Sequence, residues 1–431
     1  MSLTSHRRCR ATEARGIHYG WAVVAATFLT MLVVAGAVGA PGVFIVPLQR
    51  EFGWSAADIS GALAIRFLLF GGMGPFAAAF MNRYGVRRMM LISLSVVIAS
   101  LLLSLGMSSL WQLFLLWGVA IGIGTGMTAM VLGATVATRW FGQRRGLVMG
   151  LLSASTATGQ LAFLPLLARI TEAFGWRSAM LLICGAIIFA VIVVLLLMRD
   201  RPADLNLPAY GETEIQPVAP QPASLGALMM TPLIVLKDAA RVPTFWILFF
   251  SFYICGASTN GLVQTHFIPL CGDFGLAAVS AASMLAMMGL FDFFGTLGSG
   301  WLSDRVDNRW LLFWYYGLRG LSLLYLPFSD FSLYSLSIFA IFYGLDWVAT
   351  VPPTVRLTAQ RFGPERANVV FGWIFAGHQL GAASAALAGG FSRTVWQSYM
   401  PAFVAAGILC LIGAGLVLMI NRGRADRFAP A

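Results

Sequence analysis

The chain has 431 residues, of which 59% are hydrophobic and only 10% are charged. Because soluble domains carry about 25% charged residues, this composition excludes a protein whose whole surface faces water. The net charge of +11 is compatible with nucleic-acid binding, but arginines at the cytoplasmic ends of membrane spans produce the same excess. The sequence therefore predicts a polytopic membrane protein without a nucleic-acid partner.

Apolar stretches long enough to cross a bilayer as helices, which takes roughly 20 residues, recur along the chain. We expect the first six spans at 18–46, 57–80, 87–107, 110–138, 146–168 and 176–198. The other six are expected at 244–270, 277–302, 310–328, 332–356, 367–391 and 396–420. The sequence thus predicts an all-α membrane protein with twelve transmembrane helices.

A polar, proline-rich linker separates the two sets of spans. We expect an N-terminal six-helix bundle in 1–198, a cytoplasmic linker in 199–243 and a C-terminal six-helix bundle in 244–431. Within the linker, Leu225–Leu236 is apolar but too short to span, so we expect an interfacial helix there.

Basic residues are distributed unevenly between the two sides of the predicted spans. Twenty-one of the 28 lysines and arginines fall in segments on one side, whereas four, Arg50, Arg169, Arg177 and Arg393, fall in loops on the other. Since basic residues are retained in the cytoplasm, both termini are expected to be cytoplasmic. The sequence predicts an integral protein of the cell (inner) membrane.

The two sets of spans contain repeated motifs. The loop after the fourth span, "RWFGQRRGLVMGLLSASTATGQ", matches the loop after the tenth, "RFGPERANVVFGWIFAGHQLG". Gly150 and Gly159 of the first correspond to Gly372 and Gly381 of the second. Two halves of parallel topology are typical of transporters whose halves rock against each other.

The loop after the eighth span carries the most specific motif. Gly300, Asp304 and Arg305 form G-x-x-x-D-R, which resembles the loop signature of the major facilitator superfamily. The resemblance covers nearly the whole chain and implies the major facilitator fold of two six-helix bundles. It also implies that loop aspartates and arginines form inter-helix ion pairs that hold the cytoplasmic side shut. In the first-half copy of the motif, Asn82 stands in place of the aspartate, so that latch is expected to be weaker or to use another partner.

The residues expected to act as this gate lie in both halves. They are Arg83, Arg87, Arg144, Arg145, Asp304 and Arg305. The alternative for each arginine is simple anchoring on the cytoplasmic side. Arg356 lies near a helix end, where we expect its side chain to snorkel.

The first span narrows the resemblance to one branch of the superfamily. "HYGWAVVAATF" resembles the start of the first helix in monocarboxylate transporters and oxalate:formate antiporters, and Asp292 resembles the aspartate of their eighth span. Two positions depart from that pattern, because Gly42 stands where those carriers have a lysine and Thr296 where they have an arginine. His378 falls near a lysine of the oxalate carrier. The resemblance implies a small, monocarboxylate-like organic anion as substrate.

Charged residues within the predicted spans are candidates for function. A charge at the bilayer centre costs at least about 2.5–3.5 kcal/mol, so it should face a cavity or a partner. Arg66 is the leading candidate for binding an anionic substrate, and its alternative is a structural pair with a neighbouring helix. Arg319 is a second candidate, which Asp292 or Asp346 would otherwise neutralise. His378 lies near mid-membrane and is also expected to contact substrate.

The two acidic residues in the membrane have two interpretations. Asp292 and Asp346 are expected to couple transport to protons, because a substrate anion that competes for a nearby arginine would link protonation to transport. In the alternative, Asp292 permanently balances Arg319 and helps to pack the second half.

Amide side chains complete the predicted site. Asn260 and Gln264 are four residues apart and therefore lie on one helix face, and Gln160 in the fifth span is expected to line the same cavity. In the alternative, such amides only bind neighbouring helices.

Several function classes lack their motifs in this sequence. It contains no G-x-x-x-x-G-K-[ST] and no H-E-x-x-H, and its four histidines are scattered. We therefore expect no enzyme, no cofactor and no metal site. The first hypothesis is a proton-coupled secondary active transporter that works by alternating access, as a monomer in the lipid bilayer. The alternatives are an exporter of amphipathic or aromatic compounds and a non-transporting sensor of the same fold.

Overall fold

The computed structural model describes residues 18–128, 130–215 and 225–420, and the named elements of these ranges are helices. The first half comprises α2 (Gly20–Gly39), α3 (Pro41–Phe52), α4 (Ala56–Tyr84), α5 (Val86–Ser104), α6 (Leu110–Leu113), η1 (Phe114–Ala120), α7 (Ile121–Met127), α8 (Met130–Trp140), α9 (Arg145–Phe174) and α10 (Trp176–Leu197). The linker contributes η2 (Pro202–Leu205) and α11 (Leu225–Ala239). The second half comprises α12 (Pro243–Gly256), η3 (Ala257–Val263), α13 (Gln264–Asp273), α14 (Ala278–Ser303), α15 (Asn308–Tyr325), η4 (Leu326–Phe328), α16 (Leu333–Asp346), α17 (Val351–Phe362), α18 (Pro364–Trp396) and α19 (Met400–Leu418).

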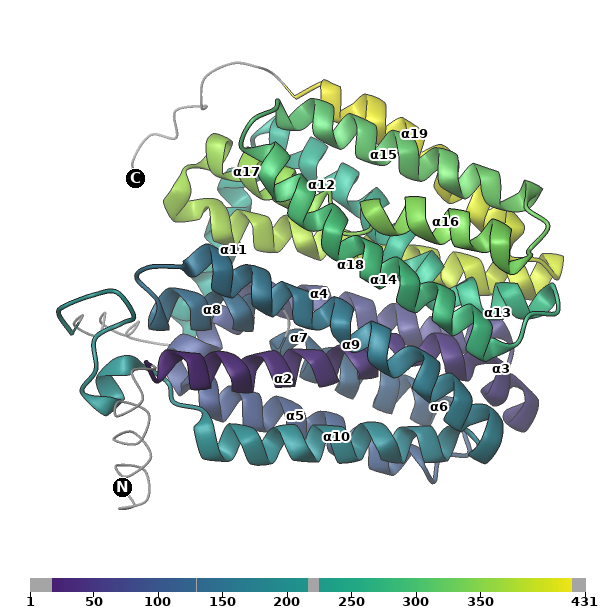
Figure 1. Ribbon diagram of the computed structural model, residues 1–431, viewed down its shortest axis with the longest axis horizontal. Coiled ribbons are helices and arrows are strands. Elements are labelled where there is room, and N and C mark those ends of the chain that lie inside the picture. The colour runs from purple at the N-terminus through teal and green to yellow at the C-terminus, as the bar shows by residue number, and fades with distance from the viewer. Residues whose placement is uncertain (1–17, 129, 216–224, 421–431) are drawn as a thin grey trace.

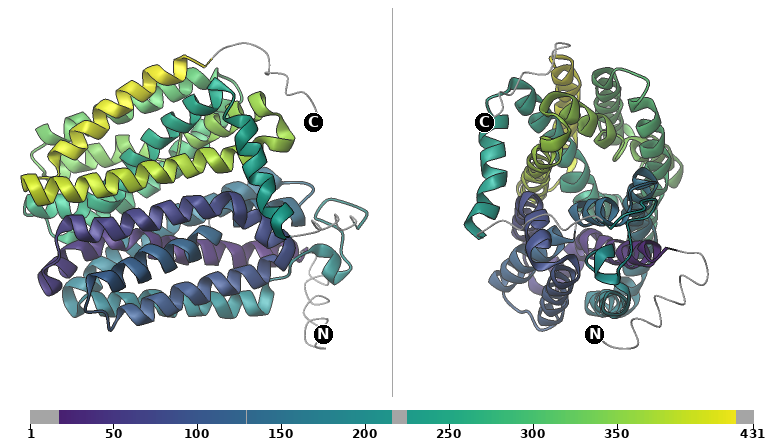
Figure 2. Two further views of the ribbon diagram at one scale, coloured as in Figure 1. Left: turned by 180° about the vertical axis from the view of Figure 1, so that it is seen from behind. Right: turned by 90° about the vertical axis from the view of Figure 1, so that its left-hand side faces the viewer.

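The helices form two layers with their long axes roughly aligned. In Figure 1, α2 to α10 make up the lower layer and α12 to α19 the upper one. We call the end where α2 begins and α19 ends the proximal end, and the opposite end the distal end. Figure 2 shows α11 crossing between the layers at the proximal end, where it packs on α18 and α4. The interfacial helix expected from the sequence thus exists, although it extends to Ala239.

The length and composition of the helices show an integral membrane protein. Within the described residues, ten helical segments are long and apolar enough to cross a membrane, several of them composed of consecutive helices, as in Gly20–Phe52. Helices α9 and α15 occupy the places of the fifth and ninth expected spans but are not among these ten. The all-α membrane fold is therefore confirmed, and the expected number of twelve spans is only partly confirmed.

Single glycines make several of the tight connections between antiparallel helices. Gly85 joins α4 to α5, Gly175 joins α9 to α10, and Gly363 joins α17 to α18, with φ angles of 88°, 82° and 78°. Residues with a Cβ atom rarely adopt such angles, so glycine permits one-residue connections here. These short connections fix which helices are neighbours within each layer.

The repeated glycines of the sequence make equivalent close contacts in the two halves. A Cβ atom on Gly159 of α9 would lie 2.3 Å from the carbonyl oxygen of Leu32 on α2. A Cβ atom on Gly381 of α18 would lie 1.9 Å from the carbonyl oxygen of Tyr253 on α12. In each half the repeat therefore lets two backbones touch, which positions the walls of the space between the layers.

The two layers touch directly at the distal end. The backbone N–H of Ala57 donates to Oγ1 of Thr394 at 3.1 Å. A Cβ atom on Gly390 would lie only 2.4 Å from Oγ of Ser60, and one on Gly42 would lie 2.8 Å from the carbonyl oxygen of Gln264. The contacts of α4 with α18 and of α3 with α13 thus close this end of the molecule.

Candidate functional site

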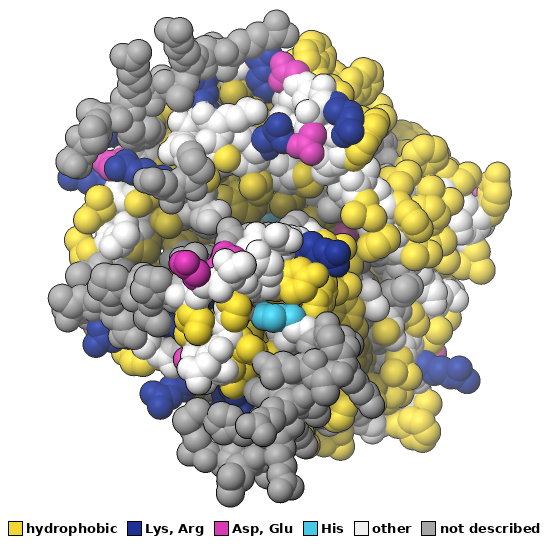
Figure 3. Space-filling model, turned by 60° about the vertical axis from the view of Figure 1, so that its left-hand side comes forward, with side chains coloured by type: hydrophobic (Ala, Val, Ile, Leu, Met, Phe, Trp, Pro, Cys, Tyr) yellow, Lys and Arg dark blue, Asp and Glu magenta, His cyan; other side chains and the backbone are white. Residues whose placement is uncertain are grey.

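A cavity of about 560 Å³ lies between the two layers. It is lined by residues of both halves and extends toward the proximal end, where Met149 and Gly150 of α9 face Gly300 and Trp301 of α14. In Figure 3, with the proximal end turned forward, the surface is hollowed between the layers. Together with the closed distal end, this hollow makes a space that is accessible from one side of the molecule.

Polar groups from several helices converge on the cavity. Four residues predicted from the sequence line it: Asn260 and Gln264 of the seventh segment, Asp292 of α14 and His378 of α18. The neighbouring Gln379, which the sequence analysis did not single out, also lines it. The Nε2 atom of Gln264 and the Oε1 atom of Gln379 are buried without a hydrogen-bond partner among the described residues. Since buried amides are normally paired, these two atoms are available to a cargo molecule.

The cavity wall is otherwise strongly aromatic. The aromatic residues that line it are Phe70, Phe252, Phe293, Trp301, Trp347 and Phe375. The ring of His378 stacks on Phe375, with centroids 5.5 Å apart and planes inclined by 12°, and also contacts Phe252 at 4.8 Å. The geometry combines apolar surface with a few polar groups, as small-molecule sites do.

Arg66 and Gln160 are not placed in the cavity by the described contacts. Arg66 is 4% exposed, and its guanidinium carbon lies 4.9 Å from the centroid of the Phe67 ring. It is absent from the cavity lining among the described residues. The side chain of Gln160 lies outside the described residues. The roles expected for these two residues remain predictions.

Arg319 forms a buried ion pair with Asp346. Its Nε atom donates to Oδ2 of Asp346 at 2.9 Å, and both side chains are almost completely buried. Its Nη2 atom donates to the carbonyl oxygens of Asp346 and Trp347, and its Nη1 atom donates to Sγ of Cys255 at 2.9 Å. Of the two acids that the sequence offered, Asp346 is thus the one bonded to Arg319. Arg319 is not among the described cavity-lining residues, which favours the structural interpretation of this arginine.

The tenth helical segment is broken beside this pair. Helix α16 ends at Asp346 and α17 begins at Val351, with a turn over 347–350 between them. Pro352 and Pro353 have no N–H to donate to the carbonyls of residues 348 and 349, and their rings clash with a continuous helix. The N–H of Val351 instead donates to the carbonyl oxygen of Val348 at 2.9 Å. One span over 332–356 is expected from the sequence, and the proline pair is the signal in it that marks the break.

Asp292 and Ser299 of α14 bond to the broken backbone. Oδ1 of Asp292 accepts hydrogen bonds from the N–H of Val348 at 2.8 Å and from Oγ1 of Thr296 at 2.9 Å. Oγ of Ser299 donates to the carbonyl oxygen of Ala349 at 2.5 Å. Together with Arg319 of α15, α14 therefore supplies hydrogen-bond partners to the broken backbone, as irregular backbone in a membrane requires.

A glycine brings α14 close enough for these bonds. A Cβ atom on Gly295 would lie 1.8 Å from the carbonyl oxygen of Leu345. Helices α14 and α16 therefore touch backbone to backbone one turn from Asp292, which explains how a short aspartate side chain reaches Val348.

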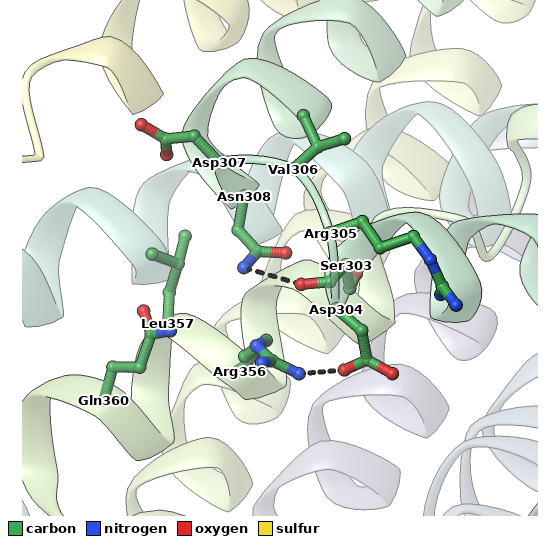
Figure 4. Close-up of a pocket in the computed structure, with 9 residues that line it drawn as sticks. All are labelled: Ser303, Asp304, Arg305, Val306, Asp307, Asn308, Arg356, Leu357 and Gln360. Carbon is green, nitrogen blue, oxygen red and sulfur yellow. Dashed lines mark hydrogen bonds and ion pairs between the residues drawn. The ribbon is translucent and has the colours of Figure 1, made fainter.

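The second-half gate residues form contacts at the proximal end of α14. Asp304 forms an ion pair with Arg356 of α17, as Figure 4 shows. Beyond the snorkelling expected at its helix end, the half-exposed side chain of Arg356 thus links two helices of the second half. The guanidinium of Arg305 lies 4.2 Å from the ring centroid of Trp301 and points away from this pair. Nearby, Nδ2 of Asn308 donates to the carbonyl oxygen of Ser303 at 3.2 Å.

In the first half, Asp200 lies just beyond the end of α10 and contacts the expected gate residue Arg87. Oδ1 of Asp200 accepts from the backbone N–H of Arg87 at 2.8 Å, and Nη2 of Arg87 donates to the carbonyl oxygen of Leu195. Asn82 accepts a 2.5 Å bond from Arg139, and this bond replaces an ion pair at that position. Asn82 thus has Arg139 as its partner, and the Asp200 carboxylate bonds the backbone of Arg87, so a latch in this half remains a prediction.

The remaining gate residues make local or linker contacts. Arg83 lies over the ring of Tyr84, and Arg144 lies over the ring of Tyr210 in the linker, each at 5.8 Å. The side chain of Arg145 lies outside the described residues. Among the residues that the structure describes, the recorded contacts of these gate side chains stay within one half or reach the linker. Their role in gating remains a prediction.

Comparison with known proteins agrees with this architecture. The family model of the Major Facilitator Superfamily matches residues 27–386 and 273–431. A bacterial homolog of the human lysosomal transporter Spinster, solved in an inward-facing and occupied conformation, superposes with a TM-score of 0.73 at 14% identity, covering 92% of this chain and 96% of that one. A D-xylose-proton symporter superposes with a TM-score of 0.72 at 14% identity, covering 93% and 98%. At this identity the two structures support the fold alone.

Transporters are among the curated relatives that this chain resembles over most of its length. Monocarboxylate transporter 13 of Rattus norvegicus is 27% identical over 95% of this chain and 90% of its own length. An uncharacterized MFS-type transporter of Bacillus subtilis is 23% identical over 88% of each chain. The Fujikurins efflux protein of Gibberella fujikuroi is 24% identical over 92% of this chain and 81% of its own. The chain therefore belongs to the major facilitator superfamily, and it is a transporter rather than an enzyme.

Proposed function

We propose that the protein is a secondary active transporter that moves a small, monocarboxylate-like organic anion together with a proton. The observation that carries this proposal is the composition of the cavity. Its described lining contains one carboxylate, that of Asp292, and no lysine or arginine. The cavity also contains amide and imidazole groups that can bind a carboxylate, from Asn260, Gln264 and His378.

The single carboxylate supplies a reason for coupling. Two negative charges in a poorly solvated cavity repel each other strongly. An anionic cargo therefore binds well only when Asp292 is protonated. While the anion is bound, its charge keeps Asp292 protonated. Because no described lining cation offsets the second charge, the proton and the anion cross the membrane together. Release of the proton on the far side then expels the anion by the same repulsion.

The closed distal end and the hollow proximal end support alternating access. We propose that the bundles 1–198 and 244–431 rock about the cavity, separating Ser60 from Gly390 in the opposite conformation. With the positive side cytoplasmic, the described conformation is open to the inside. The Asp304–Arg356 pair and the Asp200 contacts would then hold each half rigid as it moves.

A second candidate is the export of amphipathic or aromatic compounds. The observation that favours it is the aromatic wall formed by Phe70, Phe252, Phe293, Phe375 and two tryptophans. A neutral aromatic cargo would stack on these rings without requiring protonation of Asp292. The two functions therefore differ in their dependence on this carboxyl group.

Uptake into proteoliposomes tests the proposal. A panel of labelled monocarboxylates and neutral aromatic compounds would be offered with and without an inward acid gradient, to wild type, Asp292→Asn and the control Asp330→Asn, which alters an exposed acid in a loop. We expect the gradient to accelerate uptake of a carboxylate by wild type and by Asp330→Asn but not by Asp292→Asn. Gradient-independent transport of aromatic compounds alone, unaffected by Asp292→Asn, would refute the anion proposal in favour of the second candidate.

A further inference from the structure

The carbonyl groups and the amide group of the break between α16 and α17 are bonded by different kinds of side chain. Arg319 of α15 and Ser299 of α14 donate to its carbonyl oxygens, whereas Asp292 accepts from its amide. We propose that this break senses the protonation of Asp292, with Arg319 and Ser299 as positioning residues that keep the rest of the break fixed. This inference rests on the proposed proton-binding role of Asp292 and adds the element through which the proton acts.

The carbonyl side of the break does not depend on proton binding. Arg319 is always charged at accessible pH, and its bonds to the carbonyl oxygens of Asp346 and Trp347 fix the end of α16. Its side chain is completely buried and outside the described cavity lining. Arg319 therefore shapes the cavity wall without touching the cargo.

The amide side of the break does depend on proton binding. A carboxylate accepts a charge-assisted hydrogen bond from an N–H, and a neutral carboxyl group is a weaker acceptor. Protonation of Asp292 therefore weakens the bond between its Oδ1 atom and the N–H of Val348. The start of α17 loosens, while Arg319 still holds the end of α16.

The residues next to the break carry this change into the cavity. Trp347, Val348, Val351 and Pro352 all line it. A small rotation at the turn over 347–350 therefore moves an aromatic ring and three apolar groups that face the cargo. Proton binding and the shape of the cavity are linked through one hydrogen bond.

Other ionisable groups face Asp292 from the helices packed around it. They are Cys255 on α12, Arg319 on α15, Asp346 on α16 and, across the cavity wall, His378 on α18. Of the acids, Asp346 is bonded to Arg319 and makes no hydrogen bond to an amide of the break in the described contacts. A variant of Asp346 therefore separates its titration from that of Asp292.

Hydrogen–deuterium exchange of the purified, cargo-free protein tests the inference. The peptide that covers 346–356 would be followed by mass spectrometry between pH 5 and 8, with rates divided by those of the π-helical segment Phe114–Ala120, which lies in the other half. We expect the normalised exchange of the break to rise about tenfold as Asp292 takes up its proton, the size expected for loss of a hydrogen bond to a charged group. In Asp292→Asn the exchange should stay high and independent of pH.

Two outcomes would overturn the inference. One is exchange of the break that still depends on pH in Asp292→Asn, and the other is exchange of the break that no longer depends on pH in Asp346→Asn. The readout needs no cargo, so it is distinguishable from a failure of the proposed function, which shows in uptake alone. If Asp346→Asn does not fold, the comparison of wild type with Asp292→Asn decides the inference.

Variants on the carbonyl side test the positioning role. Ser299→Ala removes one donor to the break, and Arg319→Lys keeps the charge but removes the forked donor. We expect both to raise exchange of the break at every pH while its dependence on pH persists, and to lower the maximal rate of carboxylate uptake without changing the concentration for half-maximal rate. Should Arg319→Lys fail to fold, Ser299→Ala alone decides. The positioning role would be contradicted by unchanged hydrogen exchange of the break in Ser299→Ala. A changed carboxylate concentration for half-maximal uptake would contradict it as well.

Discussion

The buried pair of Arg319 and Asp346 shows what the sequence discloses at the scale of single residues. The sequence places three charges in the second half of the membrane domain, Asp292, Arg319 and Asp346, but their pairing depends on how three helices rotate against one another. The structure joins Arg319 to Asp346 at 2.9 Å and leaves Asp292 to bond the backbone. Residue type therefore predicted that these charges need partners, and tertiary packing decided which partners they have.

Removal of one member of this pair should strongly destabilise the protein. Arg319→Met leaves a buried carboxylate without its cation and frees two carbonyl groups at the break. Such losses cost about 3–5 kcal/mol, so we expect a large drop in the unfolding midpoint in detergent.

The matched control is Arg356→Met, which breaks the ion pair with Asp304. The Arg356 side chain is 43% exposed and that of Asp304 is 61% exposed. Exposed pairs contribute less than about 1 kcal/mol. Equal drops in the unfolding midpoints of the two variants would show that the buried pair has no special role in stability.

Other site residues were easier to predict than the ion pair. Asn260 and Gln264 stand out as amides in an apolar helix, and their spacing places them on one face that indeed lines the cavity. The sequence does not single out Gln379 or the particular rings of the aromatic wall, since aromatic residues occur throughout the chain. Arg66 stands out equally well, yet the described cavity lining does not include it.

At the scale of elements, close contacts between helices explain why glycine stands at certain positions. Gly256 and Gly261 lie in the seventh segment, on either side of Asn260. In the structure a Cβ atom on Gly256 would lie 1.8 Å from the carbonyl oxygen of His378, and one on Gly261 would lie 2.3 Å from that of Ala382. Both glycines therefore let this segment touch α18, and the local π-helical turn of η3 accompanies the contact. The hydrophobic pattern of the sequence locates the helices. A close contact between two helices can be predicted only when it is known which helices are neighbours.

The contact of α14 with α16 provides a test at this scale. Gly295→Ala places a methyl group 1.8 Å from the carbonyl oxygen of Leu345, so the helices must separate. Overpacking of this kind costs about 1–3 kcal/mol, and we expect a lower unfolding midpoint together with weaker uptake, because Asp292 moves away from Val348. Gly298→Ala on the same helix meets no atom within 4 Å and serves as the control. A Gly295→Ala protein as stable and active as this control would contradict the described packing.

Hydropathy and internal repeats account for most of what was predictable about the whole molecule. They predicted an all-α membrane protein, and the repeated loops predicted similar halves. They did not predict how α4 packs on α18 or where the break in the tenth segment falls, because both depend on contacts between residues far apart in the chain. Among the described residues, ten segments satisfy the length and composition of a span. Helix α15 does not, because Arg309 and Arg319 lower its mean hydropathy.

Closure of the distal end should be necessary for transport. Gly390→Val would drive a side chain into Ser60 and the carbonyl oxygen of Ala56, which lie 2.4 and 2.6 Å from the position of a Cβ atom. We expect the halves to stay apart at this end. Uptake should then fall, and Asn260→Cys in the cavity should react faster with an impermeant reagent added on the distal side.

The control substitution is Gly272→Val, at a position of the same end where a Cβ atom meets no atom within 4 Å. It should leave uptake and the labelling of Asn260→Cys unchanged. Identical labelling rates in the Gly390→Val and Gly272→Val backgrounds would show that this contact does not close the molecule.

The central claim is that one carboxyl group in the cavity makes the anion and the proton cross together. Its most direct test is the pH inside proteoliposomes when an unlabelled carboxylate is added outside, with label exchange recorded in parallel. We predict that wild type acidifies the interior as cargo enters, whereas Asp292→Asn exchanges label across the membrane without moving protons. Acidification that persists in Asp292→Asn, or carboxylate entry into wild-type vesicles without any proton, would contradict the account.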